Sequence, residues 1–309
     1  MEFCTSLPDP DALKPVPVNQ TFSSPVVVCR PALPCDKADV LQFTKFTWDG
    51  GDYIRYVWDD WMADPHGLLA AAEYGGHCVG IAKASLSAPG QWWLEGFRVD
   101  PELQGRRIGS HLHEYIHGWW LEHGDGVIRF MTSSRRVKVH HLAEVFGFEK
   151  ILEMIELEAS VLDEPCESFL PVQGDEIQEA LDFALGSPQM KASNGLFDVG
   201  WSVIRPDEEV LKDMQRRGLA FWWRGRGGLL LIWQDWEDEG GFSLPACGME
   251  SLPELLLDAR RLAASKRLPV AFWIAPLTEE IMSAAEAAGY APHKSHAIFL
   301  YAKGHPARP

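Results

Sequence analysis

The sequence predicts an α+β protein in which helices cover both faces of a mixed central sheet, in three layers. Hydrophobic periods typical of strands and helices follow one another between residues 26 and 160 in the order β-α-α-β-β-β-α-β-α-β. Three strands in succession favour antiparallel neighbours, and the later helical crossovers favour parallel ones. A similar order follows a polar linker at residues 163–168, and 309 residues are enough for two such units. We therefore expect a duplicated fold.

The first unit is predicted element by element from its spacing and its turns. The second of its two early helices places Ile54, Trp58 and Trp61 on one face. The turns Gly75-Gly76 and Pro89-Gly90 separate the strands that follow. Strands are predicted at residues 26–30, 68–74, 78–86, 92–99 and 127–132, and from residue 149 onward. Helices are predicted at residues 37–46, 53–62, 108–123 and 137–146.

The second unit is predicted at residues 168–305, after a first domain at residues 25–162 and a loose, proline-rich lead-in at residues 1–24. Its strands are expected at residues 220–223, 229–233, 246–249, 270–274 and 297–302. Its helices are expected at residues 253–266 and 279–288. Near its end Ala288-Gly289-Tyr290 takes the place that Phe146-Gly147-Phe148 takes in the first unit, which indicates a duplication.

The composition excludes several classes of protein. A formal charge of −16 argues against nucleic-acid binding, which needs lysine and arginine on the contact face. The six cysteines lie far apart without a Cys-x-x-Cys pair, which favours reduced thiols and a cytoplasmic location. We find no basic and apolar leader, and no uncharged stretch that approaches the roughly 20 apolar residues of a membrane span. The expected partner is a small molecule, and a homodimer is left open.

The most informative segment joins the strand at residues 92–99 to the helix at residues 108–123, and it reads Gln104-Gly105-Arg106-Arg107-Ile108-Gly109-Ser110. A helix that opens from such a loop points unpaired backbone N–H groups and the positive end of its dipole at one spot. The glycines let a ligand approach the backbone, and the arginines add charge. These features indicate a diphosphate site. Four further basic residues are expected to assist in binding phosphate: Arg129, Arg135, Arg136 and Lys138.

The same loop resembles the acetyl-CoA pyrophosphate loop of the GNAT (GCN5-related N-acetyltransferase) superfamily, whose pattern is Gln/Arg-x-x-Gly-x-Gly/Ala. Arg107 stands where the pattern has glycine, which is tolerated if its backbone keeps a right-handed helical conformation. The resemblance implies the GNAT fold in a tandem two-domain form, with acetyl-CoA as cosubstrate and no metal. It also implies cofactor-binding roles for the following residues: Phe97, Arg98, Val99, Gln104, Gly105, Arg106, Arg107, Ile108, Gly109 and Ser110.

The resemblance further implies that the strand at residues 92–99 splays from its neighbour, so that the backbone of Phe97 and Val99 hydrogen-bonds the pantetheine arm. Strict alternation would place Glu95 on the same face as these two residues. A carboxylate on a mostly apolar strand has a raised pKa, which suits a base that deprotonates an amine. The alternative for Glu95 is a structural ion pair with Arg98 or Arg129.

The proton donor for the departing thiolate is harder to assign. The family often carries a tyrosine on its last helix, in a pattern like Asn-x-x-Ala-x-x-Leu-Tyr-x-x-x-Gly-Phe. Counted back from Gly147-Phe148, the tyrosine position holds Ala143 and the asparagine position holds Arg136. The substitutes that remain are water and three side chains: His140, His141 and Tyr115. Of these, His141 is our assignment.

The acceptor is expected at Asp49, Asp52 and Tyr53, in the region that forms one wall of the acceptor site in the family. These residues suit a cationic amine, although they are equally good turn and cap residues. The chain is also similar to histidine N-acetyltransferase-like proteins, which favours a small, amino-acid-like acceptor whose primary amine attacks directly. Gly248-Met249-Glu250-Ser251 precedes the long helix of the second unit without a basic residue. That copy is therefore expected to be degenerate, and to complete or shield the acceptor site.

Two other functions stay open. One is a CoA-binding sensor without turnover. The other is a zinc metallohydrolase, because His113-Glu114-Tyr115-Ile116-His117 matches the His-Glu-x-x-His helix of zinc proteases. Both histidines are predicted to lie away from the apolar stripe of their helix and to face solvent, and no third ligand is evident. Turnover separates an enzyme from a sensor, and loss of activity on chelation would identify the hydrolase.

Overall fold

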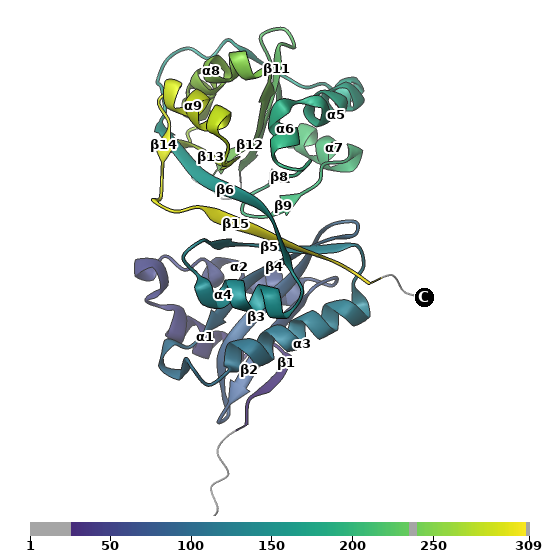
Figure 1. The fold of residues 1–309 in the computed structure, drawn as a ribbon, viewed down its shortest axis with the longest axis vertical. Helices are drawn as coiled ribbons and strands as arrows, with labels where there is room; N and C mark the ends of the chain where they lie inside the picture. Colours follow the sequence, from purple (N-terminus) through teal and green to yellow (C-terminus); the bar gives the residue numbers. More distant parts are fainter. Residues whose placement is uncertain (1–25, 235–239, 307–309) are drawn as a thin grey trace, which may run out of the picture.

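The computed structural model describes residues 26–234 and 240–306, apart from the side chains of Trp48 and Asp49. The predicted lead-in at residues 1–24 lies outside these ranges. The described strands form one 13-stranded mixed sheet and a separate two-stranded sheet, with helices on both faces of the large sheet (Figure 1). The predicted α+β fold with a mixed central sheet is confirmed. We call residues 26–160 the N-terminal half and residues 161–306 the C-terminal half.

The helices and strands of the N-terminal half lie within two residues of their predicted bounds. They are β1 (Val28–Pro31), α1 (Asp36–Thr44), α2 (Ile54–Ala63), β2 (Leu68–Tyr74), β3 (His77–Ala88), β4 (Gln91–Val99), α3 (Ile108–His123), β5 (Val127–Ser133), α4 (Val137–Val145) and β6 (Glu149–Ser160). The agreement follows from local signals. In α3, for example, Leu112, Ile116 and Trp120 recur at helical spacing and are fully buried.

The C-terminal half has further elements at residues 168–219, where none was predicted. Its elements are β7 (Phe169–Pro171), α5 (Ile177–Gly186), α6 (Pro188–Ala192), β8 (Phe197–Asp198), β9 (Val203–Ile204), α7 (Glu208–Arg216), β10 (Ala220–Trp223), β11 (Gly228–Gln234), β12 (Gly240–Cys247), α8 (Leu252–Ser265), β13 (Val270–Pro276), α9 (Glu279–Ala287), β14 (Ala291–Pro292) and β15 (Ile298–Gly304). The predicted strand at residues 246–249 was wrong, because β12 begins at Gly240. Its glycines and Pro245 lower the strand propensity of a segment that neighbouring strands nevertheless hold in the sheet.

The two halves exchange strands at the centre of the large sheet. β15 lies between β5 and β6, so that Ile298 is opposite both Ser133 and Met154. Beyond Met154, β6 runs alongside strands of the C-terminal half and pairs with β13 and with β14. Each half therefore completes the sheet of the other, as the crossing of β6 and β15 in Figure 1 shows. The division of the chain between residues 162 and 168 stays a prediction.

The sheet of the N-terminal half is covered differently on its two faces. α3 packs on one face, where Trp92 and Leu94 of β4 belong to the same apolar cluster as Leu112 of α3. α1 and α2 cover the other face. Trp93 points to this second face, since side chains alternate along a strand, and it packs at the seam between the halves against Leu196 and other residues of the C-terminal half.

Candidate active site

The expected opening between β4 and β5 is present. These strands pair in parallel only where Gln91–Trp93 lies beside Val127–Arg129. Within the described strands, no residue of β4 beyond Trp93 pairs with β5, whose remaining residues pair with β15. The edge of β4 that leads to Val99 is thus left without a strand neighbour on the side of β5. An extended ligand can add to such an edge as a further strand would.

A β-bulge interrupts β4 at Gly96. On β3, Lys83 pairs with Glu95 and Ile81 pairs with Arg98, so β4 carries one more residue than β3 over this stretch. Gly96 has a φ of +62°, and a Cβ atom at this position would overlap the ring of Trp61 on α2. Both the conformation and the close approach of Trp61 therefore require glycine here.

The bulge changes which face of the sheet Glu95 lies on. The extra residue shifts the alternation of side chains, so Glu95 lies on the face of Arg98 and the α1–α2 layer. Phe97 and Val99 lie on the opposite face with α3, where the Phe97 ring is 6.1 Å from the ring of His113. The prediction that Glu95 shares a face with Phe97 and Val99 was wrong, because it assumed an unbroken strand.

Glu95 is a carboxyl group with a raised pKa. Burial is the largest cause of the shift, and it is partly opposed by a hydrogen bond from Ser85 Oγ to Glu95 Oε1 of 2.6 Å and by the charge of Lys83. Lys83 is fully buried and forms an ion pair with Asp64. This arrangement holds a carboxyl group whose proton affinity is increased, as general-base catalysis near neutral pH requires.

Tyr53 lies near Glu95, Asp52 lies against Arg98, and the side chain of Asp49 lies outside the described residues. Asp52 is 5% exposed and accepts a hydrogen bond of 2.9 Å from Arg98 Nε, so its carboxylate is already paired. Burial raises the pKa of Tyr53 to about 12, and its ring packs edge-on against Trp61. The charge of Glu95 contributes to the raised pKa of Tyr53, so these two side chains lie close together. Arg98, which is predicted to bind the cofactor, forms an ion pair with Asp52 and so links β4 to the segment that carries Asp52.

The loop before α3 has the geometry of an anion site. The first backbone bond into the helix is donated by His111 to Arg107, and no side chain caps the helix. The N–H groups of Ile108, Gly109 and Ser110 precede that bond and point out of the helix start. Space is open around Gly105, and the exposed Arg106 and Arg107 lie beside it, with Arg106 Nη1 donating to the hydroxyl of Tyr74 at 2.7 Å.

Arg107 departs from what the sequence led us to expect. Its φ is +63°, in the left-handed region, whereas the prediction required a right-handed backbone. Because a left-handed conformation costs a non-glycine residue about 1–2 kcal/mol, the Arg107→Gly variant should unfold with a free energy about 1 kcal/mol greater than that of Arg107→Ala. Both variants lose the same charge, so the difference between their free energies of unfolding in urea measures the cost of the left-handed backbone alone. Equal stabilities would contradict the strained conformation.

α4 carries two of the histidines considered as proton donors. His141 is exposed on the helix surface. His140 lies with its Nδ1 atom 3.0 Å from the hydroxyl of Tyr301 and its Nε2 atom 3.1 Å from the carbonyl oxygen of Ser134. Tyr301 comes from β15, 161 residues along the chain, so no local pattern in the sequence could have placed its hydroxyl against α4.

The prediction that His113 and His117 face solvent was wrong. His113 is 5% exposed, with its ring centre 4.2 Å from that of Phe146, and both histidines lie near the ring of Phe148. The end of α4 and the turn after it cover this side of α3, a second layer that the helical stripe alone does not reveal. Among the residues that the structure describes, no group of three or more His, Cys, Asp or Glu side chains is arranged to hold a metal ion.

Because His113 is buried, we expect the free energy of unfolding to fall in mild acid. Burial is the main cause that lowers its pKa to about 4, against 6.5 for an ordinary histidine, so the unfolded chain binds the proton more readily. The stability that neutral His113 contributes is present above pH 6.5 and is lost as the pH falls towards 4. Between pH 7.5 and pH 5 the loss should be about 2 kcal/mol.

Denaturant unfolding at these two pH values measures this loss. The His113→Leu variant should lose about 2 kcal/mol less than the wild type on acidification, whereas the control His111→Gln, altered at an exposed position of the same helix, should behave as the wild type. An unchanged pH dependence in His113→Leu would show that His113 is not the buried group responsible.

The start of α8 in the C-terminal half differs from the start of α3. A Cβ atom on Gly248 would overlap the carboxylate of Glu250, so this acidic group folds back over the short turn at Met249–Ser251 that leads into α8. A negative charge is favourable at a helix N-terminus and repels a phosphate from the same place. The C-terminal half thus carries its own anion where the N-terminal half carries Arg106 and Arg107.

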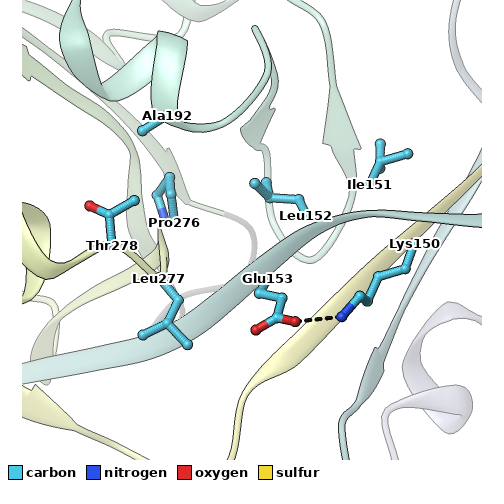
Figure 2. A pocket seen from close by; sticks show the side chains of 8 residues that line it. All are labelled: Lys150, Ile151, Leu152, Glu153, Ala192, Pro276, Leu277 and Thr278. Atoms are coloured by element: carbon cyan, nitrogen blue, oxygen red, sulfur yellow. Dashed lines mark hydrogen bonds and ion pairs between the residues drawn. The ribbon is translucent and has the colours of Figure 1, made fainter.

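A pocket of about 330 Å³ lies elsewhere, between the start of β6, the end of β13 and Ala192 of α6. Figure 2 shows Lys150 and Glu153 joined by an ion pair on its β6 side. None of the predicted site residues lines this pocket. The candidate site is therefore placed at the edge of β4 that has no strand neighbour and at the loop before α3.

The sequence and the fold were compared with those of known proteins, and the matches include the region of this candidate site. Residues 37–148, which span the opened strands and the loop before α3, match the family model described as the acetyltransferase (GNAT) family. A search of curated proteins found no match.

Solved structures of low sequence identity share the fold over both halves. A GCN5-related N-acetyltransferase from Sphaerobacter thermophilus is 15% identical, with a TM-score of 0.62 over 90% of this chain and 95% of that one. A tandem GNAT protein from the clavulanic acid biosynthesis pathway is 11% identical, with a TM-score of 0.58 over 92% of this chain and 100% of that one. A GCN5-related N-acetyltransferase from Kribbella flavida is 14% identical, with a TM-score of 0.52 over 90% of this chain and 71% of that one. These likenesses establish the tandem fold.

Proposed function

Because residues 37–148 match the GNAT acetyltransferase family model, and the chain is thereby an acyltransferase, we propose that it moves an acetyl group from acetyl-CoA to the primary amine of a small, amino-acid-like acceptor. The observation that carries the proposal is the start of α3. There, three outward N–H groups and the guanidinium groups of Arg106 and Arg107 lie at one end of the unpaired edge of β4. A diphosphate at the loop and an extended pantetheine along β4 fit this arrangement.

In the proposed reaction Glu95 takes a proton from the ammonium group of the acceptor, directly or through a water molecule. The free amine attacks the thioester carbonyl carbon, a C–N bond forms, the C–S bond breaks, and CoA leaves as a thiolate. The nitrogen gives up its second proton to water as the neutral amide forms. Burial raises the pKa of Glu95, which favours the proton transfer that starts this sequence. His141 remains the proposed donor of a proton to the thiolate, and the second candidate is His140 of the same helix, which is paired with Tyr301 of β15.

The acceptor is proposed to bind on the α1–α2 side of β4. Glu95 and Tyr53 lie there, together with the segment that carries Asp49 and Asp52. The C-terminal half reaches the carboxyl end of β5, where Arg135 Nη2 donates to Ser295 Oγ at 2.9 Å. This contact supports a role of the degenerate half in completing or shielding the acceptor site.

We also propose a cytoplasmic location and a small-molecule partner. The five cysteines that the structure describes are free thiols, as expected in a reducing compartment. Over residues 26–234 and 240–306, none of the helices combines the length and apolar character needed to cross a bilayer. The charge of −16 disfavours nucleic acid as a partner. A homodimer stays an untested prediction.

The test is release of free thiol from acetyl-CoA in the presence of a panel of small primary amines and amino acids. The proposal requires thiol release that depends on both acetyl-CoA and one class of amine, and that persists after treatment with a chelator. Binding of acetyl-CoA without thiol release on any amine would favour the sensor. Loss of activity on chelation would favour the zinc hydrolase.

A further inference from the structure

Arg129 on β5 does not lie with the loop before α3, where the sequence led us to expect it. Its neighbours Ile128 and Phe130 belong to the apolar cluster on the α3 face, so Arg129 points to the opposite face, at the seam between the halves. It is 7% exposed there, although a charged arginine is rarely buried without a partner.

The groups around Arg129 are neutral or positive. Its Nη1 atom donates to Gln91 Oε1 at 3.1 Å, and its Nε atom is buried without a hydrogen-bond acceptor. Gln91 also binds the backbone of Arg205 from the C-terminal half, accepting from its N–H at 2.7 Å and donating to its carbonyl oxygen at 2.9 Å. The guanidinium of Arg205 lies against Gly195 and donates to the carbonyl oxygen of Asn194.

Among the residues that the structure describes, neither arginine is paired with a carboxylate. Over residues 26–234 and 240–306, no carboxylate lies within ion-pair distance of Arg129 or Arg205, in a chain that carries 44 acidic residues. The positive charge of Arg205 and burial both lower the pKa of Arg129, so the charged form of Arg129 is held at a cost. Burying a guanidinium with an unpaired N–H is expensive unless an anion completes its partners.

We propose that the seam binds a phosphate-type oxyanion between Arg129 and Arg205. A guanidinium presents planar N–H donors that match phosphate oxygens, and two positive charges call for a dianion rather than a single carboxylate. One arginine comes from each half, so the anion holds the halves together. It does so beside Gln91–Trp93, where β4 and β5 are still paired before they part.

The experiment is thermal unfolding of the full chain in sodium phosphate or in sodium chloride at equal ionic strength. It is done in the Arg106→Ala/Arg107→Ala background, which removes binding of phosphate at the loop before α3. The melting temperature should rise saturably with phosphate, by about 2–4 °C or more at a hundredfold excess over the dissociation constant. The exposed Arg205→Ala variant should fold and show no such rise.

Two further variants complete the test. Arg129→Met, which replaces the buried charge by an apolar chain of similar length, should melt in chloride at or above the temperature of the parent and should not respond to phosphate. Arg216→Ala removes an exposed arginine of α7 that pairs with Asp213, and it should keep the full response. The proposal is overturned if the parent shows no saturable rise, or if Arg205→Ala responds to phosphate as the parent does.

Discussion

Replacing Glu95 by glutamine should lower kcat of the amine-dependent reaction by about 10²- to 10⁴-fold, the contribution of a well-placed general base. Glutamine keeps the shape and the possible bond with Ser85 and cannot accept the proton of the ammonium group. Because burial raises the pKa of Glu95, the wild-type rate should fall as the pH drops through that pKa, and the residual rate of the variant should lack this limb. Steady-state rates of thiol release over a pH series measure both effects.

Two controls make the result specific. The Kd of acetyl-CoA should stay within about twofold in Glu95→Gln. Glu95 lies across the sheet from Phe97 and α3, so the substitution removes no contact with the bound acetyl-CoA. Glu114→Gln, at an exposed position of α3, should keep the wild-type rate. If instead Glu114→Gln abolished activity and Glu95→Gln did not, Glu114 would be the base, as in the zinc hydrolase.

Residues 25–162 expressed alone should not form a stable fold, although the sequence predicts a domain with these bounds. Without β15, seven residues of β5 lose their partners on that strand, four of them have no partner on β4 either, and the buried Leu300 and Tyr301 leave the core. The loss of one buried leucine side chain costs about 2–5 kcal/mol, and a whole domain is stable by only about 5–15 kcal/mol. We expect no cooperative thermal transition and no stabilisation by acetyl-CoA.

The control chain restores β15 by joining residues 25–162 to residues 297–306. Its flexible linker of about 15 residues is long enough to return along β6. It should regain a cooperative transition and bind acetyl-CoA. Both chains carry the second half of β6, so the difference between them reports β15 alone. Cooperative unfolding and acetyl-CoA binding by residues 25–162 without β15 would contradict the strand exchange.

The parts of the site that the sequence predicts well depend on neighbours in the chain. α3 begins at Ile108 as expected, because its apolar period and the loop before it are local features. An anion site made of backbone N–H groups at a helix start needs no distant residue. The order of elements over residues 26–160 follows from periodicity and turns in the same way.

The parts that differ depend on contacts between distant segments. The bulge at Gly96 is fixed by the ring of Trp61 from another layer, and it moved Glu95 to the other face. His113 became buried because α4 packs over it, and Tyr301 reached α4 through a strand from the far end of the chain. The left-handed backbone of Arg107 is the local exception, since arginine gives no sign of a conformation that favours glycine. The roles of the site residues themselves stay predictions.

Calorimetric titration of the full chain with acetyl-CoA measures whether the loop before α3 binds the cosubstrate, when wild type and Arg106→Ala/Arg107→Ala are compared at the same ionic strength. We expect one site per chain in the wild type, since Glu250 lies in the turn that leads into α8, where the C-terminal half would need positive charge. We also expect a Kd about 100-fold weaker in the double variant, from the loss of two charge-assisted contacts of about 1.5 kcal/mol each. Equal affinities, or no binding by the wild type, would contradict the placement of acetyl-CoA at this loop.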